Sequence, residues 1–261
     1  MKNLFARAGR LWCAGAVLLV LRLLQNKSGF DVVTGLSKPS VPASLLMILI
    51  AACAGAELFL CTKLPKRSAD FADLFAPPEK ELTAAVCGSL LLAAGGGLLA
   101  ADAFLNGGTA ASVAGLLALA AGAGLVAFNR SLRAGEQELP LLALLPLLFF
   151  SVFFVLAVYL PLEDDPVFFR YYLPILSAAV TACAFSLLAG FCRHESSLRA
   201  FQFTADMAVI LCLAAAADAG TANRLLYIGC AVILSVYLVL RREPEELPEE
   251  PEEPEKEQAK A

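Results

Sequence analysis

Residues 82–130 read LTAAVCGSLLLAAGGGLLAADAFLNGGTAASVAGLLALAAGAGLVAFNR, and this stretch decides the fold. It contains two apolar runs, each close to the ~20 residues that a helix needs to cross the hydrocarbon core of a bilayer. Asn106, Gly107 and Gly108 separate the two runs and supply a turn. The stretch therefore predicts a transmembrane hairpin of two closely packed helices, with one acid, Asp102, near the turn.

Similar apolar runs recur along the rest of the chain. Hydrophobic residues make up 59% of the 261 positions, against roughly 45–50% in soluble domains. Because the excess lies in long runs, the sequence predicts an all-α, polytopic membrane protein embedded in a lipid bilayer. We expect one domain, residues 1–242, that forms a bundle of eight transmembrane helices at about 4–25, 42–64, 81–106, 109–129, 139–160, 169–192, 200–219 and 221–240.

The segments outside these runs differ in character. Residues 65–80 form a loop in which Phe71, Leu74 and Phe75 fall at helical spacing, which favours a short helix lying on the membrane surface. Residues 243–261 hold nine Glu against two Lys among several prolines, which is typical of a disordered acidic tail. The first run could instead be a cleaved signal peptide, but no small-residue cleavage site follows it, so we interpret it as a helix.

The distribution of Lys and Arg predicts the orientation, because cytoplasmic loops carry the excess of positive charge. With eight helices and a cytoplasmic N-terminus, thirteen Lys and Arg residues before the tail fall on the inner side: Lys2, Arg7, Arg10, Lys63, Lys66, Arg67, Lys80, Arg130, Arg133, Arg193, Arg199, Arg241 and Arg242. Five fall on the outer side: Arg22, Lys27, Lys38, Arg170 and Arg224. We therefore expect both termini in the cytoplasm, and the short loops favour a plasma-membrane protein.

Two sets of short, similar segments raise the alternative of an internal repeat. Residues 101–103 and 108–110 resemble residues 217–219 and 220–222, and residues 52–54 resemble residues 182–184. A 4+4 parallel repeat would relate helices of the same orientation. In a chain so rich in alanine, chance matches are the competing explanation.

Charged residues inside membrane spans are rare and costly, so they are the candidate functional residues. Asp102, Asp218, Arg22 and Arg224 fall at comparable depth near the outer ends of their helices. They could line a gate or contact a substrate. The alternative is a structural clamp, or ordinary charges at helix ends. Asp102 also follows Gly88 and Gly95 at intervals of seven residues, which predicts that it faces a neighbouring helix.

A second layer of charge lies toward the predicted inner side. Glu57 precedes the end of its apolar run by seven residues, and Asp206 follows Arg199 by seven. Two acids at one depth could bind a cation or relay protons. Alternatively each pairs locally, Glu57 with Lys63 and Asp206 with Arg199. The sequence marks Glu57 as the first candidate for a functional residue.

The hairpin carries small residues at a spacing of four. Ser89, Ala93, Gly97 and Ala101 follow this spacing on its first helix, and Ala114, Ala118 and Gly122 on its second. Small-xxx-small faces let helix backbones approach closely. They predict either close packing within the bundle or helix–helix association with a partner.

Two hypotheses for function come before a third, a lipid-modifying enzyme, for which the sequence has no recognisable catalytic set. The first is a transporter or channel for an ion or small solute, with the six charged residues along its pathway. The second is a non-catalytic membrane scaffold or regulatory subunit. The chain lacks the hydrolase, metalloprotease and nucleotide-binding motifs, so we predict no enzyme activity and no cofactor. No cysteine or histidine has metal-ligand spacing, and we expect no metal and no nucleic-acid partner.

Overall fold

A computed structural model describes residues 2–30, 40–64, 79–134, 140–159, 172–192 and 196–240. These residues form eight α-helices: α1 (Lys2–Ser28), α2 (Val41–Thr62), α4 (Glu79–Asn106), α5 (Thr109–Ala134), α6 (Pro140–Tyr159), α7 (Tyr172–Phe191), α8 (Leu198–Ala215) and α9 (Thr221–Leu240). Each overlaps one predicted helix, so the all-α prediction is confirmed. The predicted surface helix in residues 65–80 falls almost wholly outside the described residues, as does the acidic tail.

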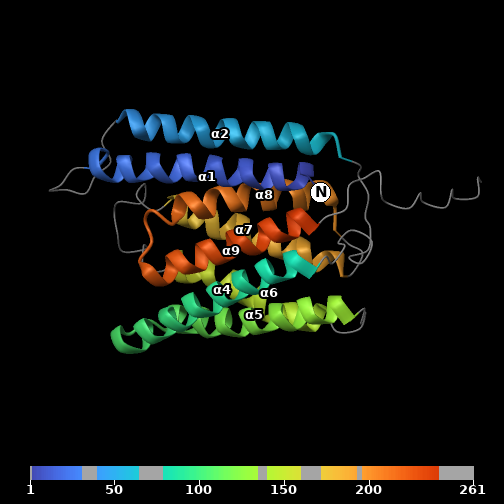
Figure 1. Cartoon of the computed structure of the whole chain (residues 1–261). Coiled ribbons are helices and arrows are strands. Elements are labelled where there is room, and N and C mark those ends of the chain that lie inside the picture. The colour runs from blue at the N-terminus through green and yellow to red at the C-terminus, as the bar shows by residue number, and fades with distance from the viewer. Residues whose placement is uncertain are drawn as a thin grey trace, which may run out of the picture.

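The helices lie side by side and run alternately in opposite directions (Figure 1). The N-termini of α1, α4, α6 and α8 therefore share one end of the bundle, here named the inner end after the predicted orientation. α8 is the central helix and contacts α1, α2, α7 and α9. α2 lies at one edge, where it packs against α1 and α8. The described helices do not establish a 4+4 repeat, which stays a prediction.

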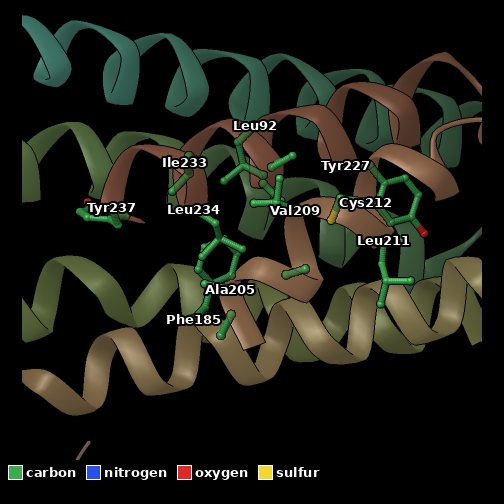
Figure 2. Close-up of a cluster of buried hydrophobic side chains, with 14 of the residues drawn as sticks. Leu92, Phe185, Ala205, Val209, Leu211, Cys212, Tyr227, Ile233, Leu234 and Tyr237 are labelled. Atoms are coloured by element: carbon green, nitrogen blue, oxygen red, sulfur yellow. The ribbon is translucent and has the colours of Figure 1, made fainter. Parts of the chain in front are cut away.

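The tightest core surrounds α8 and α9. Fourteen of the 18 residues of α8 are buried, and they lie on nearly every side of the helix. Such all-round burial is expected for a helix that is surrounded by other helices. Figure 2 shows side chains of α8, such as Val209, gathered with Leu92 of α4, Phe185 of α7 and Leu234 of α9. This core fixes the positions of the polar residues at both ends of α8.

Glycine explains how closely α4 approaches its neighbours. A side chain at Gly115 of α5 would meet the Ala100 nitrogen of α4 at 2.5 Å, and one at Gly95 of α4 would meet the Leu226 nitrogen of α9 at 2.9 Å. Backbones can approach this closely only where both surfaces are small. The predicted turn is present too, and Gly107 adopts a φ of +79° that glycine tolerates without strain.

The predicted small-residue faces lie mostly inside the bundle. Ala114, Ala118 and Gly122 of α5 are buried, whereas the α4 series runs from buried Ser89 to exposed Ala101. A Cβ on Gly122 would meet the Ser89 carbonyl oxygen at 2.7 Å. Gly96 rather than Gly97 makes the close approach to α5, since a Cβ at Gly96 would lie 2.6 Å from the Ala118 Cβ. Association with a partner through these faces stays a prediction.

Seven of the described helices are long and apolar enough to cross a membrane: Ala6–Ser28, Val41–Thr62, Thr83–Asn106, Thr109–Arg130, Tyr172–Phe191, Leu198–Ala215 and Thr221–Leu240. The apolar part described for α6, Ala143–Tyr159, is shorter. By the composition of its helices the chain is a multi-pass membrane protein. The eighth span remains a prediction that rests on the full 20 residues of α6.

Candidate functional site

The inner end of the bundle holds a cluster of buried charges that three helices supply. Arg7 and Arg10 lie one turn apart on α1, Glu57 lies on α2, and Gln202 and Asp206 lie one turn apart on α8. Residues three or four positions apart share a face of a helix, so each pair projects to one side. We call these five residues the inner charge cluster.

Arg7 joins the two acids of this cluster. One of its Nη atoms lies 3.3 Å from Glu57 Oε2 and donates a second, close hydrogen bond to Asp206. Arg10 Nη2 donates to Glu57 Oε1 at 3.3 Å, and Gln202 Nε2 donates to Asp206 Oδ1 at 2.9 Å. The sequence prediction that Glu57 and Asp206 lie at one depth is consistent with this geometry, and the predicted local pairs with Lys63 and Arg199 are not formed.

The inner charge cluster is balanced, with two arginines against two carboxylates. The Asp206 side chain has no exposed surface and that of Glu57 is 7% exposed, whereas that of Arg10 is 53% exposed. A buried carboxylate without a partner would be strongly unfavourable in this environment. The arginines therefore make it possible for both acids to lie charged inside the bundle, and Arg10 extends the cluster to the inner surface.

A second cluster lies at the opposite end of α1. Arg22 Nε donates to Asp218 Oδ2 at 2.7 Å, and Asn26 Nδ2 donates to Asp218 Oδ1 at 2.6 Å. Arg22 also donates to Gln25 and lies over the ring of Tyr172, 5.4 Å from its centroid. Arg22 is fully buried, so these contacts replace its hydration. We call these five residues the outer charge cluster.

Arg224 donates its hydrogen bonds to backbone carbonyl groups and not to the outer charge cluster. Its side chain is exposed and donates to the carbonyl oxygens of Ala216 and Ala219, each at 3.1 Å. α8 ends at Ala215, four residues before the predicted end at 219. Arg224 therefore binds carbonyl groups that follow the end of that helix, a favourable place for a cation.

Asp102 is exposed and accepts a hydrogen bond from Asn106 Nδ2 at 2.8 Å. The prediction that it faces a neighbouring helix is wrong. Gly88 and Gly95 do face α9, but Gly95 already lies against Ala222 in the first turn of α9. α4 is the longer helix, so Asp102, two turns beyond Gly95, passes the end of its neighbour.

Arg7 and Arg10 are the members of the inner charge cluster that the sequence indicated only as positive charges on the inner side. Their spacing of three residues, at the depth of the two acids, was the sequence signal that could have identified them as members of the site. A pairing between α1 and α8 could not be derived from it, because Arg7 and Asp206 are separated by 199 positions. Among the described residues, no group of three or more His, Cys, Asp or Glu side chains could hold a metal ion.

Comparisons with known proteins add no assignment. No protein-family model matches the chain, and no curated protein or solved structure matches it. The two charge clusters and the arrangement of the helices are therefore the observations on which a function can be argued.

Proposed function

We propose that this chain is a non-catalytic membrane scaffold or regulatory subunit. The observation that carries the proposal is the pairing of Glu57 and Asp206 with Arg7 and Arg10 at the inner end of the bundle. A conduit for ions needs acids that face a polar pathway, whereas a scaffold needs its intramembrane charges paired. The paired geometry of the inner charge cluster favours the scaffold.

A scaffold also needs a surface for its partner. The small-residue face of α5 is buried against α4, which leaves other faces for this role. α2 has such a face, since Ile48, Ala52 and Phe59 are exposed on it. We further propose that the chain lies in a plasma membrane with its inner end toward the cytoplasm, an orientation that the bias of Lys and Arg supports.

Transport of an ion or small solute is the second candidate, and one feature favours it. Glu57 and Asp206 come from different helices and share one arginine, and Arg10 connects them to the surface at the inner end. Arg7 Nε is also buried without a hydrogen-bond partner in the described part of the chain. An exchange of partners at Arg7 would be the first step of such a pathway.

Flux through vesicles separates the two candidates. Purified protein would be reconstituted into vesicles of phosphatidylethanolamine and phosphatidylglycerol, and the movement of H⁺, Na⁺, K⁺ and Cl⁻ would be followed with ion-sensitive dyes. Wild type and Glu57→Gln are compared, with Asp102→Asn as the control for loss of an acid outside the charge clusters. Scaffold function predicts background flux in all three and a lower thermal stability for Glu57→Gln alone. Wild-type flux that Glu57→Gln abolishes, while its fold is retained, would refute the scaffold.

A further inference from the structure

The edge helix α2 is attached unevenly along its length. Three of its 22 residues are buried, namely Leu46, Glu57 and Cys61, and two of these lie in its last two turns. At Gly55, a Cβ would meet nothing within 4 Å. Between helices in lipid there is little hydrophobic drive, because lipid tails are as apolar as the side chains that they replace. Polar contacts and close packing therefore decide whether α2 stays docked.

The polar contacts that α2 makes with other described helices are all at its inner end. Glu57 accepts from Arg7 and Arg10 at 3.3 Å each, and Arg199 of α8 donates to the Leu64 carbonyl just beyond the helix. At the other end, Ser40 Oγ, just before the helix, accepts from the Ala43 N–H in the first turn of α2 itself. The inner end of α2 is thus held by charge, and the rest of the helix by apolar contact.

α1 provides the contrast. It is joined to α8 at its inner end through Arg7 and near its outer end through Arg22, which pairs with Asp218 after α8. Its Gly15 allows a close approach to Leu213, whose Cβ would lie 2.8 Å from a methyl group at that position. α1 is therefore fixed at both ends and in the middle, and it belongs to the stable part of the bundle.

We propose that α2 can separate from the rest of the bundle and that the negative charge of Glu57 holds its inner end against α1 and α8. Loss of this charge removes the attraction to both arginines. Arg7 keeps Asp206 as its partner, and Arg10 already reaches the surface, so neither arginine is stranded. The bundle of α1, α8 and α9 can then stay intact while α2 moves away. The inference is independent of whether the chain acts as a scaffold or a transporter.

Cys61 is a natural reporter for this motion. It lies one turn beyond Glu57 on the same face of α2 and is 2% exposed, so it can react with a thiol reagent only when the inner end of α2 moves. Cys212 of α8 and Cys230 of α9 have no exposed surface and report on the stable part of the bundle. Labelling the full chain in vesicles with N-ethylmaleimide, read at each cysteine by mass spectrometry, follows all three at once.

The expected result is that Glu57→Gln raises the labelling rate of Cys61 about tenfold, which corresponds to a loss of about 1.4 kcal/mol in docking free energy. Cys212 and Cys230 should keep their wild-type rates. Arg10→Gln should raise the Cys61 rate less, because Glu57 keeps Arg7. Asp102→Asn, which removes an acid outside the charge clusters, should change nothing.

Two outcomes would overturn the proposal. If Cys61 keeps its wild-type rate in Glu57→Gln, the charge does not hold α2. If Cys212 and Cys230 become reactive together with Cys61, in Glu57→Gln and also in the milder Arg10→Gln, the charge holds the whole bundle and α2 is not separable. The control Asp102→Asn distinguishes both outcomes from a general effect of removing an acid.

Discussion

At the scale of single residues, Arg7 matters most at the inner end, because it contacts carboxylates from two other helices. A buried ion pair often contributes little net stability, since both ions lose their hydration on burial. Removing one partner alone is costly, because the other charge then stays buried without its partner. The costs of single substitutions in the cluster should therefore not add up in a double variant.

The pair of Arg7 and Asp206 provides the first test. Asp206→Leu should lower the free energy of unfolding by about 1–2 kcal/mol, since it removes a buried hydrogen bond to a charged group while Arg7 keeps Glu57 as its partner. Arg7→Met should cost more, about 3 kcal/mol, because it leaves the buried Asp206 carboxylate without its ion-pair partner. The double variant should cost clearly less than the sum of the two, because Glu57 then keeps Arg10 and no charge is stranded. Unfolding in mixed micelles would measure all three, and additive costs would contradict the shared cluster.

The two arginines predicted for the outer layer should behave differently from one another. Arg22→Gln removes a fully buried cation from Asp218 and should cost about 3 kcal/mol. Arg224→Gln removes hydrogen bonds from an exposed side chain and should cost about 1 kcal/mol or less. Equal thermal stabilities of the two variants in detergent would show that the difference in burial has no energetic consequence.

At the scale of helices, the close approaches of α4 depend on glycine at particular positions. Gly115 and Gly55 form a matched pair, because both lie inside helices but only Gly115 faces a neighbouring backbone. In a helix interior, alanine is more favourable than glycine by about 1 kcal/mol. The effect of adding a methyl group should therefore change sign between the two positions.

Gly55→Ala should leave stability unchanged or raise it slightly, since open space surrounds the new methyl group. Gly115→Ala should destabilise the protein by about 1–3 kcal/mol, because its Cβ would lie 2.5 Å from the Ala100 nitrogen and 2.6 Å from the Gly96 carbonyl oxygen. Melting temperatures of both variants in one detergent provide the comparison. A neutral Gly115→Ala would mean that α4 and α5 separate at little cost.

A structural feature of this protein could be predicted from the sequence only where a local sequence pattern determines it. Each helix could be predicted because a run of ~20 apolar residues is a local pattern. The turn at Gly107 is equally local. The partner of Glu57 could not be predicted, because Arg7 lies 50 positions away and no local pattern determines which helix faces meet. Asp102 was misplaced because the relative lengths of α4 and α9 decide which residues extend past the interface.

At the scale of the whole molecule, alternation of the helices places the α8–α9 turn and the start of α8 at opposite ends (Figure 1). Gly220 and Ser197 are exposed positions at these two ends. A cysteine at either position adds little strain, since nothing lies within 4 Å of a Cβ at Gly220 and the Ser197 side chain forms no capping hydrogen bond.

Labelling of intact cells with a membrane-impermeant maleimide tests the orientation. Gly220→Cys should be labelled in intact cells, and Ser197→Cys only after the cells are opened, because Lys and Arg residues concentrate at the end that carries Ser197. The reverse pattern would invert the orientation. Labelling of both positions from the same side would contradict the membrane-spanning arrangement of α8.

The pairing of α1 with α8 and with Asp218 just after it has a consequence for biosynthesis. Asp206 and Asp218 are made 199 and 196 residues after Arg7 and Arg22. During translation, α1 therefore stays in the membrane without these aspartates until the ribosome has made α2, α4, α5, α6 and α7 and then α8. α8 must then enter between helices that are already inserted, before α9 packs against α4 and α8. A chain truncated before α8 would hold the arginines of α1 in the membrane without these aspartates, at the energetic cost of unpaired charge there.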